Sequence, residues 1–399
     1  MDVGNAEFDR ITDRRNTDSL KYDCAAQRGM PEGLIPLWVA DMDFRSPAPV
    51  RDALSRVADR GVFGYTVPQD DYYAAVTAWF AERHDYRFPR EHIITAPGVV
   101  FALAMAVRAF TDEGDGVLIQ RPVYYPFTEV ITDNNRRLVN SPLRWNANDG
   151  RYEPDFEDME RRIAGDDVRL FLLCNPHNPV GRVWTADELR RMGDICARHG
   201  CVVVSDEIHC DFTFPGFKHT VFPSIRDEFA QHCVLCTSPS KSFNLAGLQI
   251  SNIVIANKSL RRAFRDEISK AGYSQPSLPG IVACKAAYGE GGAWLDALKG
   301  YLLGNLDFLR DFLRTRIPEI GLIEPEGTYL LWLDMRKLAA TRDAARKLIV
   351  DGAGLWLDDG SMFGPEGEGF QRVNIACPRA ILEQALERLS VAVDGVNVE

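Results

Sequence analysis

The 399-residue sequence predicts an α/β fold, with a large domain built on a mostly parallel sheet and a smaller second domain. From residue 91 onward, short apolar runs alternate with amphipathic stretches of helical length, as in a parallel sheet covered by helices. The pattern changes after about residue 289, where a glycine-rich break precedes a long helical stretch. The chain also exceeds what one hydrophobic core usually organises, and its 46% hydrophobic content is enough to fill two.

Six apolar runs in the large domain have the length and composition of buried strands. They span residues 92–96, 116–120, 168–174, 201–205, 233–237 and 250–256. Residues 99–110 are apolar on nearly every face, which predicts a buried helix. Thr185 and Glu188 have the spacing of a capping box and predict another helix, which runs to about His199.

The second domain begins with the long helical stretch. Its expected elements are a helix over 293–316, a strand over 329–333, a helix over 342–350, a strand over 372–375 and a closing helix from Pro378. The N-terminal segment is too irregular to fold alone, so we expect it to pack on the second domain or on a partner subunit. The expected division is 1–48 for this segment, 49–289 for the large domain and 290–399 for the small domain.

Charge and cysteine content exclude several classes of protein. The net charge of -11 comes from interspersed acids and bases, with no basic stripe that could bind nucleic acid. The first residues do not resemble a secretory signal, and no run of about 18 apolar residues could cross a membrane, so we expect a cytoplasmic location. The nine cysteines are odd in number and irregularly placed, which indicates reduced thiols.

Cys233 and Cys236 have the C-x-x-C spacing of a zinc or redox motif. The surrounding residues alternate like a buried strand, however, and no second ligand pair is visible. We therefore expect a structural role for both thiols and no metal site.

Three polar segments follow predicted strands, at the end of the strand where open α/β sheets bind ligands. They are Asn-Pro-His-Asn-Pro-Val-Gly at 175–181, Ser-Asp-Glu-Ile-His at 205–209 and Ser-Pro-Ser-Lys-Ser-Phe-Asn at 238–244. In the third, Lys241 offers a primary amine for a Schiff base, and the neighbouring hydroxyls are available to phosphate oxygens. Alone, such a lysine is more often a solvated loop residue.

Asp206 and Asn178 stand at the ends of two other strands. A partly buried carboxylate such as Asp206 needs a cationic partner, and a protonated pyridine nitrogen would be one. Asn178 lies between two prolines, in a rigid turn that suits an amide hydrogen bond of fixed geometry. Taken alone, Asp206 would be structural or a helix cap, and Asn-Pro would be only turn chemistry.

Two further segments suit a flat, phosphorylated ligand. Residues 96–100 supply a strand, a turn at Gly98 and a helix N-terminus, whose free N–H groups favour an anion. Tyr124 and Tyr125 follow another strand and could lay a ring on the ligand, although paired aromatics are more often part of a core.

In this order, the motifs resemble fold-type I pyridoxal 5'-phosphate (PLP) enzymes of the class I/II aminotransferase superfamily. More narrowly, the chain resembles the cystathionine β-lyase branch that includes MalY, PatB and cystalysin. The segments that carry this likeness are 21–23, 37–44, 64–66, 122–126, 175–179, 205–209 and 241–247. The resemblance implies an aspartate-aminotransferase-like fold, with a seven-stranded sheet in the large domain and a smaller α+β C-terminal domain.

The resemblance also implies roles for individual residues. Lys241 would hold PLP as a Schiff base and act as catalytic base, Asp206 would pair with the pyridine nitrogen, and Tyr124 would border the ring. Asn178 would bond the phenolic oxygen. The phosphate would be surrounded by Gly98, Val99, Val100, Ser238 and Ser240, and by Tyr65 of the neighbouring subunit in a homodimer with shared sites. The substrate would meet Arg372, which grips the α-carboxylate, and Tyr125, Asn178 and Ala40.

Two residues depart from the usual aminotransferase pattern. Three residues after Asp206, where a tyrosine is usual, the chain has His209, which we still place near the cofactor. Eight residues after Lys241, where a phosphate-binding arginine is usual, it has Gln249. Both departures fit the lyase branch.

The expected activity is α,β-elimination from L-cystathionine, L-cysteine or related S-substituted cysteines. The products would be a thiol such as homocysteine or hydrogen sulfide, with pyruvate and ammonia. Two alternatives stay open: an aminotransferase, which shares the early steps, and a regulatory protein that binds a transcription activator in the manner of MalY.

Overall fold

The computed structural model describes residues 5–339 and 341–396 and divides the chain into two compact units. The sheet unit comprises residues 46–178 and 182–292. The terminal unit comprises the described residues up to Arg45, residues 179–181 and the described residues from Ala293 onward.

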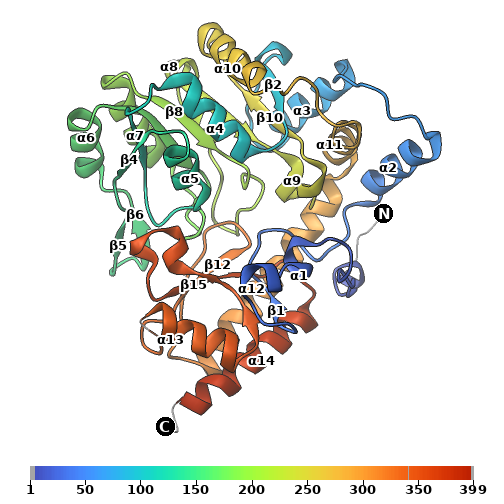
Figure 1. Ribbon diagram of the computed structural model, residues 1–399, viewed down its shortest axis with the longest axis vertical. Helices are drawn as coiled ribbons and strands as arrows, with labels where there is room; N and C mark the ends of the chain where they lie inside the picture. Colours follow the sequence, from blue (N-terminus) through green and yellow to red (C-terminus); the bar gives the residue numbers. More distant parts are fainter. Residues whose placement is uncertain (1–4, 340, 397–399) are drawn as a thin grey trace. The chain divides into compact units, whose positions relative to one another are not determined.

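Seven strands in the described part of the sheet unit form one sheet, in the order β2, β10, β9, β8, β7, β3, β4 (Figure 1). The strands are β2 (Ile93–Ala96), β3 (Gly116–Ile119), β4 (Arg137–Asn140), β7 (Val168–Cys174), β8 (Val202–Asp206), β9 (Cys233–Thr237) and β10 (Ser251–Val254). β10 is antiparallel to both of its neighbours, and the other neighbouring pairs are parallel. This confirms the expected mostly parallel, seven-stranded sheet.

Helices connect the strands and cover the sheet. They are α2 (Ala48–Arg60), α3 (Asp70–Arg83), α4 (Val99–Phe110), α5 (Pro126–Thr132), α6 (Phe156–Gly165), α7 (Ala186–Arg198), α8 (Asp227–Gln231), α9 (Pro239–Ser242), α10 (Lys258–Lys270) and α11 (Leu278–Glu290), with a hairpin of β5 (Arg144–Asn146) and β6 (Arg151–Glu153). The connections through α4 and α5 run one way across the sheet, and those through α6 and α7 run back. Because such crossovers are right-handed, the two pairs of helices cover opposite faces.

Local sequence explains where these elements begin and end. α4 spans the predicted residues and buries six of its side chains in the core on one face of the sheet. At the start of α7, Thr185 and Glu188 form the predicted capping box. β8 starts one residue later than predicted and includes Asp206, because Asp206 pairs with Cys236 of β9.

The terminal unit joins both ends of the chain. Its elements are α1 (Leu20–Asp23), β1 (Ile35–Pro36), α12 (Gly292–Arg316), β11 (Gly321–Ile323), β12 (Leu330–Asp334), α13 (Arg342–Arg346), β13 (Leu355–Trp356), β14 (Asp358–Asp359), β15 (Phe370–Asn374) and α14 (Arg379–Val396). Described strands form a sheet in the order β11, β12, β15, β14, and β1 pairs with β13. The helix predicted over 342–350 is α-helical only to Arg346 and continues as a π-helix over Lys347–Gly352.

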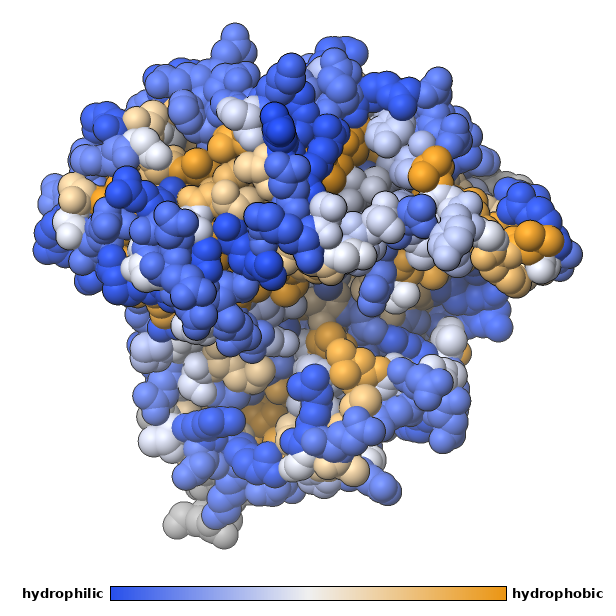
Figure 2. All heavy atoms as spheres, turned by 45° about the horizontal axis from the view of Figure 1, so that its top comes forward, coloured by the Kyte–Doolittle hydropathy of each residue, from blue (hydrophilic) through white to orange (hydrophobic). Residues whose placement is uncertain are grey.

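An irregular segment, residues 61–69, links α2 to α3 and leaves large apolar side chains exposed. Val62 and Phe63 are each 68% exposed, and Tyr65 is 96% exposed. Figure 2 shows hydrophobic residues at its right edge, where this segment lies. Across residues 5–339 and 341–396, no helix is long and apolar enough to cross a membrane.

Candidate active site

The predicted site residues of the sheet unit follow strands that point the same way. Gly98 comes after β2, Tyr124 after β3, Asn178 after β7, and Asp206 ends β8, while Lys241 follows β9. Because these strands are parallel to one another in the sheet, their carboxyl ends lie at one edge. The fold therefore brings the five residues to the same edge.

Lys241 lies in α9, a single helical turn whose N-terminus is capped by a side chain. Ser238 is its N-cap: Oγ accepts from the backbone N–H of Ser240 at 3.0 Å and donates to the carbonyl of Ile250 at 2.7 Å. Ser242, the last residue of α9, donates its hydroxyl to the Asp211 carboxylate. Lys241 itself is half-buried. The turn is thus fixed at both ends, with the lysine between them.

Asp206 is a buried carboxylate at the centre of the sheet edge. It is only 6% exposed and lies between Cys174 of β7 and Cys236 of β9. Burial raises its pKa to about 7, although its hydrogen bond from Ile208 and the charge of Lys241 act in the opposite direction. Burial therefore destabilises the ionised form of Asp206, and a positively charged partner would stabilise it.

Backbone contacts join the loops that carry Tyr124 and Asn178. The N–H of Tyr124 donates to the carbonyl of Asn178 at 3.0 Å, and the N–H of Asn178 contacts the Cys174 sulfur at 3.4 Å. The rings of Tyr124 and Tyr125 are in contact, with centroids 5.1 Å apart. The backbone bond therefore joins the loop of this aromatic pair to the loop that carries Asn178.

The N-terminus of α4 can hold an anion. Gly98 is the N-cap residue in an extended conformation, and no described side chain caps the helix. A Cβ added at Gly98 would meet no described atom within 4 Å, so the space before the helix is open. The N–H groups and the helix dipole favour phosphate there, and buried Asp206 suits a ring cation. These features fit PLP, with Val99 and Val100 in the first turn.

Arg372 and Ala40 belong to the terminal unit, which brings them together. Arg372 is 2% exposed; its Nη2 donates to the carbonyl of Trp38 at 3.0 Å and forms an ion pair with Asp358. Burial raises the pKa of Asp358, while the charge of Arg372 opposes that rise. The guanidinium is thus held in place by a carboxylate that the sequence did not single out.

The segment from Leu37 to Asp43 is fixed to β15 through its carbonyls. Asn374 Nδ2 donates to the carbonyls of Val39 and Asp41 at 2.8 and 2.7 Å, and the Tyr329 hydroxyl donates to the Ala40 carbonyl at 3.0 Å. The N–H of Asn374 donates to Leu37 at 2.8 Å. Ala40 and Arg372 therefore lie on one rigid piece of structure.

The remaining predicted residues are placed as follows. His209 is buried at 4% exposure in the turn after β8. Ser240 is half-buried in α9, and Tyr65 lies in the exposed segment after α2. Sequence reasoning missed Asp211, Ser242 and Asp358. For the first two, the only available signal was their nearness in sequence to Asp206 and Lys241.

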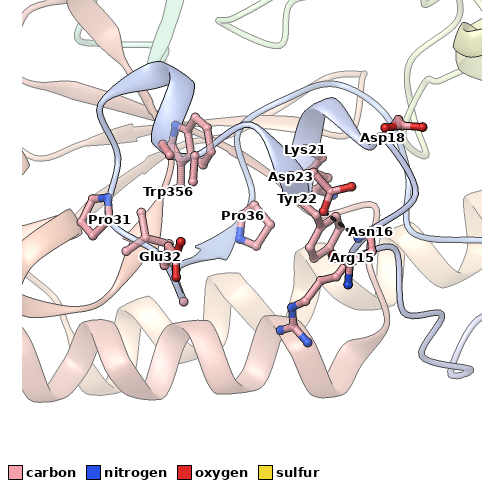
Figure 3. A pocket seen from close by; sticks show the side chains of 14 residues that line it. Arg15, Asn16, Asp18, Lys21, Tyr22, Asp23, Pro31, Glu32, Pro36 and Trp356 are labelled. Carbon is pink, nitrogen blue, oxygen red and sulfur yellow. Dashed lines mark hydrogen bonds between the residues drawn. The ribbon is translucent and has the colours of Figure 1, made fainter.

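A cavity of about 750 Å³ opens on the terminal unit, beside the N-terminal segment and Trp356 (Figure 3). Lys21 lines it, with its buried Nζ 2.8 Å from Asp43 Oδ2. The described residues that line this cavity include none of the predicted site residues. We therefore do not assign it to the active site.

Comparison with known proteins agrees with the motifs. The family model described as Aminotransferase class I and II matches residues 32–389. Cystathionine beta-lyase PatB of Bacillus subtilis (strain 168) is 40% identical over 385 residues, which cover 96% of this chain and 99% of PatB.

Solved structures are similar over nearly the whole chain. Cystalysin from Treponema denticola, which contains a PLP cofactor, has a TM-score of 0.94 at 37% identity and covers 97% of this chain and 98% of its own. The PLP-bound C-S lyase from Staphylococcus hominis has a TM-score of 0.92 at 34% identity, covering 98% and 99%. The resemblance drawn from the motifs is confirmed, and the chain belongs to the aminotransferase class I and II family.

Proposed function

We propose that the chain is a PLP-dependent carbon–sulfur β-lyase, which cleaves L-cystathionine, L-cysteine or related S-substituted cysteines to a thiol, pyruvate and ammonia. The observation that carries this is the placement of Lys241 and buried Asp206 at one sheet edge, beside the open N-terminus of α4. The names of PatB and of the Staphylococcus hominis C-S lyase support the reaction, and cystalysin supports the cofactor.

When bound, PLP withdraws electrons from the α-carbon of an amino acid. The Asp206 carboxylate would hold a proton on the ring nitrogen, and its burial would strengthen that ionic hydrogen bond. Lys241 Nζ would hold the cofactor and would also be the base that removes the α-proton of the substrate. Arg372 would bind the α-carboxylate, while Tyr124 and Asn178 would orient the ring and its phenolic oxygen. Ser240 and the first turn of α4 would hold the phosphate. Ser238, whose hydroxyl proton is donated to Ile250, would border it.

The direct test is an assay for pyruvate and free thiol with L-cystathionine and no keto acid present. We expect stoichiometric release of both products by the wild type, and none by Lys241→Ala. The departures at His209 and Gln249 favour the lyase over an aminotransferase. Turnover that requires a keto acid and yields no pyruvate would overturn the proposal in favour of transamination.

We also propose a homodimer with shared sites, in which Tyr65 reaches the phosphate of the neighbouring subunit. The exposure of Tyr65, with Val62 and Phe63 beside it, supports this, because exposed apolar groups in one segment indicate an interaction surface. A cytoplasmic location is proposed as well, since the nine cysteines are free thiols and thiols persist in reducing compartments.

A further inference from the structure

Asp211 is a buried carboxylate to which the sequence assigned no function. It is 6% exposed and lies five residues after Asp206, in the turn that follows β8. Oδ1 is 2.9 Å from His84 Nε2 and accepts from Trp79 Nε1 at 3.3 Å. Oδ2 accepts from the hydroxyl of Ser242. Both oxygens therefore have partners, and one partner belongs to the turn of the catalytic lysine.

The turn after β8 is itself well ordered by short-range hydrogen bonds. The N–H of Ile208 donates to Asp206 Oδ1 at 3.2 Å, and the N–H of Cys210 donates to the Glu207 carbonyl at 3.0 Å. The N–H of Phe212 donates to the His209 carbonyl at 2.9 Å. These hydrogen bonds order the backbone from Asp206 to Phe212, the segment that carries Asp211.

The lysine turn depends on contacts outside itself. α9 has four residues, too few to be stable as an isolated helix. Ser238 fixes its beginning, and the hydroxyl of Ser242 fixes its end to Asp211. Ser242 is 1% exposed and directly follows Lys241, so this hydrogen bond is made out of solvent.

Asp211 is in turn held from α3. His84 is the C-cap residue of α3, and Trp79 lies one turn earlier in the same helix. His84 also packs edge-on against His219, whose Nε2 is 2.6 Å from Glu207. The ligand atoms of His84, Cys210 and Asp211 lie within 4.8 Å of one another, as in some metal sites. Because both Asp211 oxygens are hydrogen-bonded, we assign the carboxylate to the protein network.

We propose that Asp211 and Ser242 are positioning residues, whose hydrogen bond sets the location of Lys241 relative to Asp206. The link joins the segment that carries the carboxylate to the turn that carries the amine. This inference rests on the proposed function, because it concerns how the same lysine reaches the cofactor. It requires that loss of the link harms the attachment of PLP to Lys241 more than it harms folding.

The test compares Ser242→Ala and Asp211→Asn with the wild type, and with Thr111→Val as matched control. Thr111 is also buried in the sheet unit, and its hydroxyl donates to Val107 and accepts from Arg136. Three quantities are measured: the dissociation constant for PLP with cofactor-free protein, the fraction of bound PLP that borohydride fixes to Lys241, and kcat and KM for pyruvate formation. Melting temperatures are recorded for every variant.

We expect Ser242→Ala to raise the dissociation constant for PLP at least about tenfold, as loss of a buried hydrogen bond to a charged group allows. The borohydride-fixed fraction should fall, and kcat should fall about tenfold with KM within about twofold. Because Ser242 acts through Asp211, the double variant should be no worse than Asp211→Asn alone.

Two results would overturn the proposal. One is that Ser242→Ala keeps wild-type PLP affinity and borohydride fixation. The other is that Thr111→Val loses as much of both at an equal loss of melting temperature. If Ser242→Ala does not fold, Ser242→Gly, which also lacks the hydroxyl, replaces it under the same criteria. Failure of the wild type to form pyruvate would sink the lyase proposal, while the PLP measurements would still decide this one.

Discussion

At the scale of single residues, the chemistry depends on charges that are taken out of water and compensated. Asp206 is buried with its pKa raised to about 7, whereas Arg372 is buried against Asp358. A buried charge without a partner is expensive, and a buried pair is strongly destabilised when one partner is removed. The two residues should therefore respond to substitution in different ways.

The pKa of Asp206 predicts how the stability of the cofactor-free protein depends on pH. The folded-state pKa rises from 3.8 to about 7 because of burial, so the folded protein binds the proton more tightly than the unfolded chain. The contribution of Asp206 to the free energy of unfolding is therefore fully present below pH 3.8. It is lost as the pH rises toward 7, which lowers the free energy of unfolding by on the order of 4 kcal/mol.

Asp206→Asn should remove that dependence. In urea unfolding of cofactor-free protein, the variant should be more stable than the wild type at pH 8, with the difference shrinking toward pH 5. Equal pH profiles for the two proteins would contradict the assignment of the raised pKa to Asp206.

Arg372 calls for a substitution that leaves Asp358 paired. Arg372→Lys keeps a positive charge beside Asp358 but lacks the two-pronged guanidinium that matches a carboxylate. We expect KM for L-cystathionine to rise at least about tenfold and kcat to stay within about threefold, because Arg372 would bind the substrate and the transition state equally well. Arg336→Lys, at an exposed arginine of the same unit, is the control. An unchanged KM would remove Arg372 from the substrate site.

At the scale of elements, sequence reasoning was accurate where local chemistry decides and failed where distant loops meet. The residues of α4, β7 and β9 were predicted without error, because apolar runs and caps are local signals. The Asp211–Ser242 and Asp358–Arg372 contacts were not predicted, since spacing along a chain does not tell which side chains meet. The change to a π-helix after Arg346 also had no signal that we can identify.

The start of α7 offers a prediction about stability. Thr185→Ala removes the cap and should lower the free energy of unfolding by about 1 kcal/mol. Glu188→Ala should cost more, about 3 kcal/mol, because Glu188 also pairs at 2.8 and 2.9 Å with Arg182, which is 2% exposed. Asp187→Ala, at an exposed acid in the same turn, should change it by less than about 0.5 kcal/mol. Urea unfolding measures all three, and equal losses for Thr185 and Glu188 would contradict the ranking.

At the scale of the whole molecule, the motifs indicated the fold class and the family, but not the strand order. The order β2, β10, β9, β8, β7, β3, β4 places the first strand beside the last, a pairing that depends on long-range packing. The five residues at the sheet edge could be predicted as a set, because each followed a recognisable strand.

The proposed dimer predicts that two inactive variants can complement each other in mixed dimers. Lys241→Ala and Tyr65→Ala subunits should each be nearly inactive alone. In a mixed dimer one site keeps both Lys241 and Tyr65, so co-expression should restore part of the activity. Lys241→Ala co-expressed with Asp206→Ala, two residues that the sheet unit holds at one edge, is the control and should give no rescue. Full activity of Tyr65→Ala alone would contradict the proposal that the two subunits share their active sites.

The junction between Leu37–Asp43 and β15 joins residues separated by more than three hundred positions. Residues 37–43 leave the ribosome long before β15 is synthesised, and every strand of the seven-stranded sheet is synthesised in between. The order of synthesis and the order of assembly therefore differ, because residues 37–43 are made early but form their hydrogen bonds to β15 late. Nascent chains arrested before Phe370 should keep a protease-resistant sheet unit, while the backbone at residues 37–43 is cleaved by protease more readily than in the full chain.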